Sequence, residues 1–165
     1  MPELVRLKKH NTIPFLNVGV AATPTWARIG KSTVFDLVLN AQTEENNFIE
    51  DEMTTTDVTR YAPSLAQELQ CNKGDAAFDY LYDLFFNLPV GEDVKKNLLV
   101  VFAGDVGAAG SPQFKAWNTT STLILDHFDS VAEKIYFSFT MNNIVKGKVT
   151  VSDGVPTFAP DVPTT

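Results

Sequence analysis

Residues 134–142, KIYFSFTMN, decide the fold class of this chain. In an extended segment, Phe137, Phe139 and Met141 fall on one side, because successive side chains of a strand point to opposite faces. This alternation is typical of a β-strand with one buried face. The two residues Asn142 and Asn143 predict a turn that leads from this strand to the next one.

Reading outward from this strand gives a series of short strand candidates separated by turn signals. The predicted strands are residues 26–31, 34–40, 54–59, 98–103, 117–127, 134–142 and 146–151. Residues 64–70 are ambiguous between strand and helix, and the glycine-containing stretch 104–112 is predicted to be a loop. Asp153 and Gly154 predict one further turn.

One helix is predicted between Gly74 and Pro89. Asp75 is a favourable N-cap residue, and Pro89 blocks continuation of the helix. Apolar residues lie on both sides of this helix, so it needs a cover on two sides. We expect one cover to be the sheet of its own domain and the other a neighbouring subunit. The residues predicted to make these packing or subunit contacts are Phe78, Leu81, Tyr82, Phe85 and Phe86.

About six to eight strands at this spacing, with one helix inserted, predict a mainly β (α+β) fold. The expected architecture is an antiparallel two-sheet β-sandwich or open barrel with one flanking α-helix. The length of 165 residues fits one domain. Weak periodicity marks residues 1–25 as an N-terminal arm or loop, and alternation begins with the predicted sandwich domain at residues 26–158. Residues 159–165, which are polar and contain two prolines, are predicted to be a flexible C-terminal tail.

The charge is unevenly distributed along the chain. The net charge is −7, but residues 1–31 hold five basic residues and one acidic residue. The basic residues are Arg6, Lys8, Lys9, Arg28 and Lys31. The acidic segment that follows contains Glu44, Glu45, Glu50, Asp51, Glu52 and Asp57. The overall acidity argues against a general nucleic-acid-binding surface, and the two segments predict complementary surfaces between copies of the chain.

The motifs of enzymes and of metal sites are missing from this sequence. The single cysteine, Cys71, excludes an intramolecular disulfide and a thiolate cluster, and the two histidines are far apart. Gly30, Lys31 and Ser32 imitate the end of a phosphate-binding loop, but Thr25 stands where that loop needs a glycine. We therefore expect no catalytic residue, no metal and no cofactor, and predict that the protein is not an enzyme.

Segments that direct a chain to a membrane or a secretory lumen are also missing. The N-terminal residues are basic, but polar residues and Pro14 interrupt the apolar stretch that a secretory signal requires. No apolar run reaches the length of a membrane span. We expect a soluble protein made in a cytoplasm, with no membrane partner.

Several short segments, taken together in their order along the chain, carry a resemblance to a known family. They are FLNVG (15–19), WARIGK (26–31), LVLNAQTEE (37–45), YAPS (61–64), QCNKGD (70–75), AW (116–117), VTV (149–151) and GVPTF (154–158). In these segments the chain resembles the major tail (tail tube) proteins of long-tailed, non-contractile bacteriophages (siphophages) of Gram-positive bacteria. The resemblance covers most of residues 13–158.

The resemblance implies a structural virion protein. Such proteins form hexameric rings that stack into the phage tail tube, whose β-lined channel delivers the genome into the host. It implies contacts with further copies of the chain, with tape measure, distal tail and tail terminator proteins, and transiently with phage DNA. Assembly would take place in the host cytoplasm. Excess acid would then line the channel, where it repels phosphate, or would contact the next ring.

A different class of function is the alternative. The chain could be a soluble β-sandwich binding module for a carbohydrate or a receptor, using Trp117 and the glycine-containing loop. A hydrolase with an acidic dyad is a third and weaker reading, because adjacent carboxylates on an extended segment point to opposite sides.

Overall fold

The computed structural model describes residues 12–20, 22–30, 32–106, 113–152 and 154–161. The elements in these residues are β1 (Thr12–Asn17), β2 (Trp26–Arg28), β3 (Ser32–Val38), β4 (Ala41–Asn46), β5 (Thr55–Tyr61), β6 (Ser64–Gln70), α1 (Ala76–Asn87), the 3₁₀ helix η2 (Gly91–Val94), β7 (Lys95–Val106), β8 (Gln113–Asp129), β9 (Lys134–Ser152) and β10 (Val155–Pro160). All described strand pairs are antiparallel. The predicted mainly β, antiparallel fold with one α-helix is confirmed.

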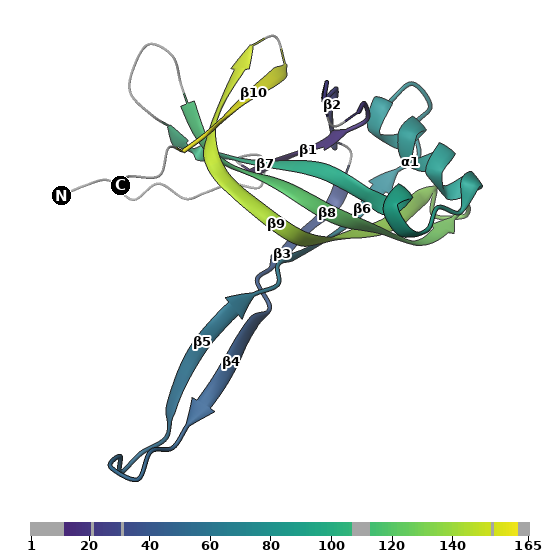
Figure 1. Cartoon of the computed structure of the whole chain (residues 1–165). Coiled ribbons are helices and arrows are strands. Elements are labelled where there is room, and N and C mark those ends of the chain that lie inside the picture. Colours follow the sequence, from purple (N-terminus) through teal and green to yellow (C-terminus); the bar gives the residue numbers. More distant parts are fainter. Residues whose placement is uncertain (1–11, 21, 31, 107–112, 153, 162–165) are drawn as a thin grey trace, which may run out of the picture.

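One large sheet forms the body of the molecule (Figure 1). Its strand order is β2-β1-β7-β8-β9-β6-β3, and β10 also pairs with β9. The first half of β9 pairs with β6 and the second half with β10, while β8 follows β9 along its other side. Among the described residues, β3 pairs only with β6 and β2 only with β1, so the strand order ends in two open edges.

The second sheet is the two-stranded hairpin of β4 and β5, which projects away from the body (Figure 1). The core of the body therefore lies against the two faces of the large sheet. On one face, α1 covers a cluster that includes Leu65, Leu98 and Phe139. On the other face, a smaller cluster gathers around Phe15 and Val149.

The predicted helix is confirmed, with its expected cap. The side chain of Asp75 accepts a hydrogen bond from the backbone N–H of Ala77 at 3.3 Å, which satisfies one of the free donors of the first turn. Leu88 ends the helix in the left-handed conformation, with φ at 49°, and Pro89 follows. Residues 64–70, ambiguous in the sequence, form strand β6 with Leu65, Gln67 and Leu69 buried on one face.

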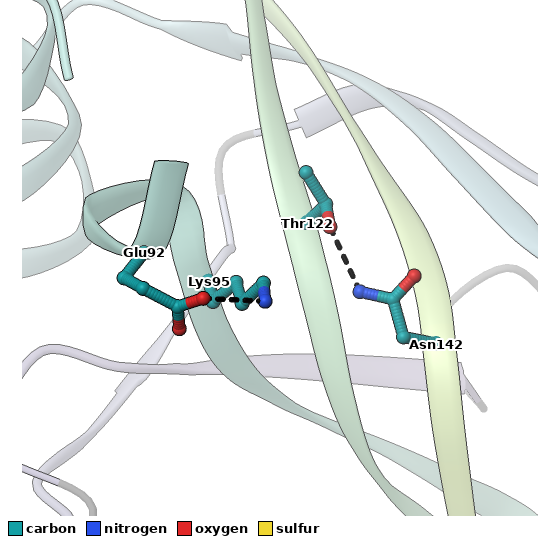
Figure 2. Close-up of polar contacts among 4 residues, drawn as sticks. All are labelled: Glu92, Lys95, Thr122 and Asn142. Carbon is teal, nitrogen blue, oxygen red and sulfur yellow. Dashed lines mark hydrogen bonds and ion pairs between the residues drawn. The ribbon is translucent and has the colours of Figure 1, made fainter. Parts of the chain in front are cut away.

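The predicted turn at Asn142 and Asn143 is wrong, because β9 continues through both residues. Thr120 is opposite Asn143 and Ser121 is opposite Met141, which leaves Asn142 as an extra residue in β9. The asparagine pair therefore marks a β-bulge. The side-chain nitrogen of Asn142 donates to the Thr122 hydroxyl on β8 at 2.8 Å, which fixes the bulge to the neighbouring strand (Figure 2).

The sheet starts earlier in the chain than the sequence indicated. Within the predicted arm, β1 pairs with both β2 and β7, and Pro14, Phe15, Leu16 and Asn17 are all buried. The loop prediction is wrong for these residues, because a strand covered on both faces shows no alternation of apolar and polar residues. At the other end of the chain, β10 extends to Pro160, and a turn at Gly154, where φ is 78°, precedes it.

Candidate functional site: a projecting hairpin and an open sheet face

The β4–β5 hairpin leaves the body as an exposed arm (Figure 1). Every residue from 38 to 61 is exposed except Asn46, which is half-buried. Asn40 anchors the base, in a left-handed conformation with φ at 48° that asparagine tolerates better than most residues. Its side-chain nitrogen donates to the Ala62 carbonyl at 3.0 Å and to the Ser64 hydroxyl at 3.1 Å. The arm is therefore attached through a defined base, and its outer part contacts only solvent in the single subunit.

The acidic residues singled out in the sequence all lie on this hairpin. Glu44 and Glu45 are on β4, Glu50, Asp51 and Glu52 are in the connection between the strands, and Asp57 is on β5. The register places Glu44 directly opposite Asp57, whose carboxylate accepts a hydrogen bond from Asn46 at 3.2 Å. Like charges at opposite positions of a sheet destabilise it. The hairpin therefore gains from a cationic partner.

The end of the hairpin is apolar as well as acidic. We name Phe48, Ile49 and Met53 the hairpin tip; their exposed fractions are 61%, 105% and 80%. No motif marks this group in the sequence, although the neighbouring Phe48 and Ile49 interrupt an otherwise polar stretch. Large apolar side chains gathered at an exposed end are typical of a surface that binds protein.

The structure describes only one of the basic residues predicted to complement the acidic segment. Arg28 lies on the edge strand β2 and is exposed. Its neighbours across a shallow hollow of about 370 Å³ are Gly30, Asn72 and Asp75. Arg6, Lys8, Lys9 and Lys31 lie outside the described residues. The structure therefore describes the whole acidic set but only Arg28 of the basic set, and their pairing stays a prediction.

The predicted helix contacts divide into two groups. Phe78 and Leu81 are buried in the core, and Phe85 is half-buried against Phe128, with ring centroids 5.9 Å apart. Tyr82 and Phe86 are exposed, with exposed fractions of 45% and 80%, although the ring of Tyr82 also packs edge-on against Phe128 with centroids 6.0 Å apart. The sheet therefore covers one side of α1, as expected, and the second side has no cover within the described residues.

The other exposed surface is a part of the large sheet on the face opposite α1. Residues paired across antiparallel strands share a face, so the registers define rows that cross the sheet. One row joins Ala66, Ser138 and Ile124, and the next joins Ser64, Thr140 and Thr122. A third row joins Asn143, Thr120 and Asn97. We name these nine residues the open face; all nine are exposed or half-buried.

Charged groups lie at the margins of the open face. On one side, Lys95 is opposite Thr122 and forms an ion pair with Glu92 at 2.7 Å (Figure 2). On the other side, a row contains Glu68, which is 3.4 Å from the Lys134 ammonium. Tyr136 is directly opposite Glu68 in this row. Burial, and after it the charge of Glu68, raises the pKa of Tyr136. The open face itself consists of hydroxyl, amide, methyl and aliphatic side chains.

The alternative function as a binding module depends on Trp117 and on the glycine-containing loop. Trp117 is half-buried and packs edge-on against Phe102, with ring centroids 5.2 Å apart, so its ring contributes to the core. Residues 107–112 of the glycine-containing loop lie outside the described residues. In the part of the chain that the structure describes, no group of three or more His, Cys, Asp and Glu side chains is arranged to bind a metal. The single described α-helix is too short to cross a membrane.

Comparison with known proteins gives no match to any family model and no match to a curated protein. Solved structures do match. The tail of an empty GTA particle, refined with helical C6 symmetry, has a TM-score of 0.55 at 11% identity, over 93% of this chain and 99% of that one. A sheath/tube terminator of PVC, an extracellular contractile injection system, has a TM-score of 0.52 at 11% identity, over 87% of this chain and 97% of that one. The chain therefore has the fold of tail tube and terminator proteins.

Proposed function

We propose that this chain is a structural virion protein of the major tail protein class, which assembles into hexameric rings that stack into a tail tube for genome delivery. The observation that carries the proposal is the β4–β5 hairpin, an exposed arm with an apolar and acidic end. An isolated two-stranded hairpin is at best marginally stable in water. Contact with another copy supplies the cover that the hairpin lacks in the single subunit.

The open edges of the large sheet support ring formation. β3 is an edge strand in which Val34, Phe35 and Val38 have exposed fractions of 37–42%. An exposed apolar edge of this kind pairs readily with another chain. We assign the ring contact to β3 of one copy and β2 of the next, which lie at opposite ends of the strand order, and a contact of this kind is heterologous. Heterologous contacts generate closed rings when the rotation between copies closes. A sixfold-symmetric tail with the same fold supports a ring of six.

The charge pattern supports stacking of these rings. We assign the acidic hairpin to the contact between successive rings, with the basic residues Arg6, Lys8, Lys9, Arg28 and Lys31 as its counterpart. Complementary charge orients partners and speeds their encounter. The exposed residues Tyr82 and Phe86 of α1 supply a further contact between subunits.

The proposal also defines partners and location. The tube would meet tape measure, distal tail and tail terminator proteins and would pass phage DNA. The protein would be assembled in the host cytoplasm and become part of the virion. Trp117, the residue on which a carbohydrate-binding or receptor-binding function depended, is packed into the core. The structural role is therefore preferred over a binding module.

Assembly of the purified protein tests this function. The informative variant replaces residues 44–57 with Asn-Gly, because Thr43 and Val58 are directly paired and a two-residue turn fits between them. We expect rings or tubes of the natural chain in negative-stain electron micrographs. The shortened variant should remain a folded monomer that unfolds cooperatively on heating, as the natural subunit does.

Two results would contradict the proposal. One is a natural chain that stays monomeric at high concentration, which is the behaviour of a binding module. The other is a shortened variant that forms the same tubes as the natural chain, which would remove the hairpin from the assembly contact.

A further inference from the structure

The open face is uncharged and rich in hydroxyl groups, unlike the acidic hairpin. Five of its nine residues carry a hydroxyl group: Ser64, Thr120, Thr122, Ser138 and Thr140. Two more, Asn97 and Asn143, carry amides. None of the nine is charged, although the chain as a whole has a net charge of −7. The acidic residues of the central segment lie on the hairpin.

The same face lacks the features of a contact between subunits. Ile124 is its single large apolar residue, with an exposed fraction of 49%. The hairpin tip and the β3 edge, by contrast, expose several large apolar side chains each. Hydroxyl and amide groups that are not paired with protein keep their bonds to water, since burying them without partners is unfavourable. The open face is therefore suited to remain hydrated after assembly.

We infer that the open face lines the channel of the assembled tube and presents nucleic acid with an uncharged, hydroxyl-covered wall. This inference rests on the proposed function. It replaces the acidic lining expected from composition, because the predicted acidic residues lie on the hairpin. Binding of DNA depends on cationic groups that neutralise phosphates and release counterions. The nine residues carry no such group, and the lysines at the margins, Lys95 and Lys134, are each paired with a glutamate. A wall of this kind has little cationic charge to retain DNA and little unpaired acid to repel it.

Cysteine labelling of assembled tubes tests the location. The background variant is Cys71→Ala, which removes the chain's one cysteine. Ala66→Cys then places a thiol on the open face, and Ser130→Cys places one in the exposed turn between β8 and β9 as the matched control. Both positions should react with N-ethylmaleimide in tubes. A maleimide carrying a protein-sized polyethylene glycol should label Ser130→Cys in tubes and free subunits, but Ala66→Cys only in free subunits.

Lysine substitutions test the chemistry of the wall. Tubes are assembled in the presence of short duplex DNA and then treated with nuclease. We expect Thr120→Lys tubes to retain nuclease-resistant DNA, about tenfold or more above the natural chain, because each ring gains several phosphate-binding charges. The matched control Ser130→Lys adds one positive charge in the exposed turn between β8 and β9, so DNA that it binds should remain sensitive to nuclease.

The outcomes separate this inference from the proposed function. If tubes form but the bulky maleimide labels Ala66→Cys as fully as Ser130→Cys, the open face lies outside and the inference is wrong. If natural tubes protect as much DNA as Thr120→Lys tubes, the wall binds DNA and the inference is wrong. If the natural chain forms no rings or tubes, the proposed function fails, and the inference fails with it.

Discussion

Replacement of Ile49 by serine isolates the contribution of the hairpin tip to assembly. The side chain of Ile49 is fully exposed in the single subunit. Its removal therefore leaves the free energy of unfolding of the subunit unchanged, because surface substitutions of this kind have effects within about 0.5 kcal/mol.

The expected effect appears in the assembled state. Full burial of an isoleucine side chain stabilises a contact by about 2 kcal/mol. A loss of this size corresponds to roughly a 30-fold weaker contact, since each 1.4 kcal/mol is a factor of about ten. The critical concentration for tube formation should rise by the same factor. Sedimentation of assembled material over a concentration series measures it, and thermal unfolding of the free subunit provides the stability.

Val131→Ser is the matched control, because Val131 is also exposed, at 93%, but lies in the turn between β8 and β9. The control should assemble at the natural concentration. An Ile49→Ser variant with an unchanged critical concentration would refute the reasoning, because the tip would then be exposed in the assembly too. Equal effects of both substitutions would show that the loss is not specific to the hairpin.

Further predictions concern the acidic segment, the helix and the cysteine. Lysine at residues 50–52 should shorten or abolish tubes seen by electron microscopy while the circular dichroism spectrum stays natural; tubes of normal length would contradict the stacking role. Leu81→Ala should lower the free energy of unfolding in urea by about 2–5 kcal/mol, because its side chain is fully buried. Phe86→Ser, on the exposed side of α1, should leave that free energy unchanged but weaken assembly. A Phe86→Ser subunit that is less stable than the Leu81→Ala subunit would contradict the helix packing. Burial, followed by the charge of Glu133, raises the pKa of the Cys71 thiol, so iodoacetamide should modify it more slowly in the native protein than in urea at mildly alkaline pH; equal rates would contradict the burial.

Local signals account for the parts of the fold that were predicted correctly. Asp75 as a cap and Pro89 as a stop define α1 within a few residues of sequence, and no distant contact is needed to place its ends. The strand with Phe137 and Phe139 follows from alternation alone. The register of that strand against β8 is a long-range property, and it makes Asn142 a bulge where local preference indicated a turn.

The two candidate surfaces differ in how far the sequence reveals them. The acidic segment is visible as a run of carboxylates, but its projection from the body depends on the base at Asn40 and on pairing of β4 with β5 alone. The open face is not visible in the sequence, because its members come from four separate strands. Only the registers that place Ala66 beside Ser138, and Asn97 beside Thr120, bring these residues onto one surface.

The length of β9 has a mechanical consequence. Its 19 residues span about 60 Å at the usual rise of a strand. β9 pairs with β6 at one end and with β10 at the other, and β8 pairs with it along most of its length. A force between the two halves of the sheet therefore runs along the single extended backbone of β9. Such a force loads many ladder hydrogen bonds in shear at the same time. The subunit therefore transmits tension as one stiff unit, and bending of an assembly is expected to occur at the contacts between copies.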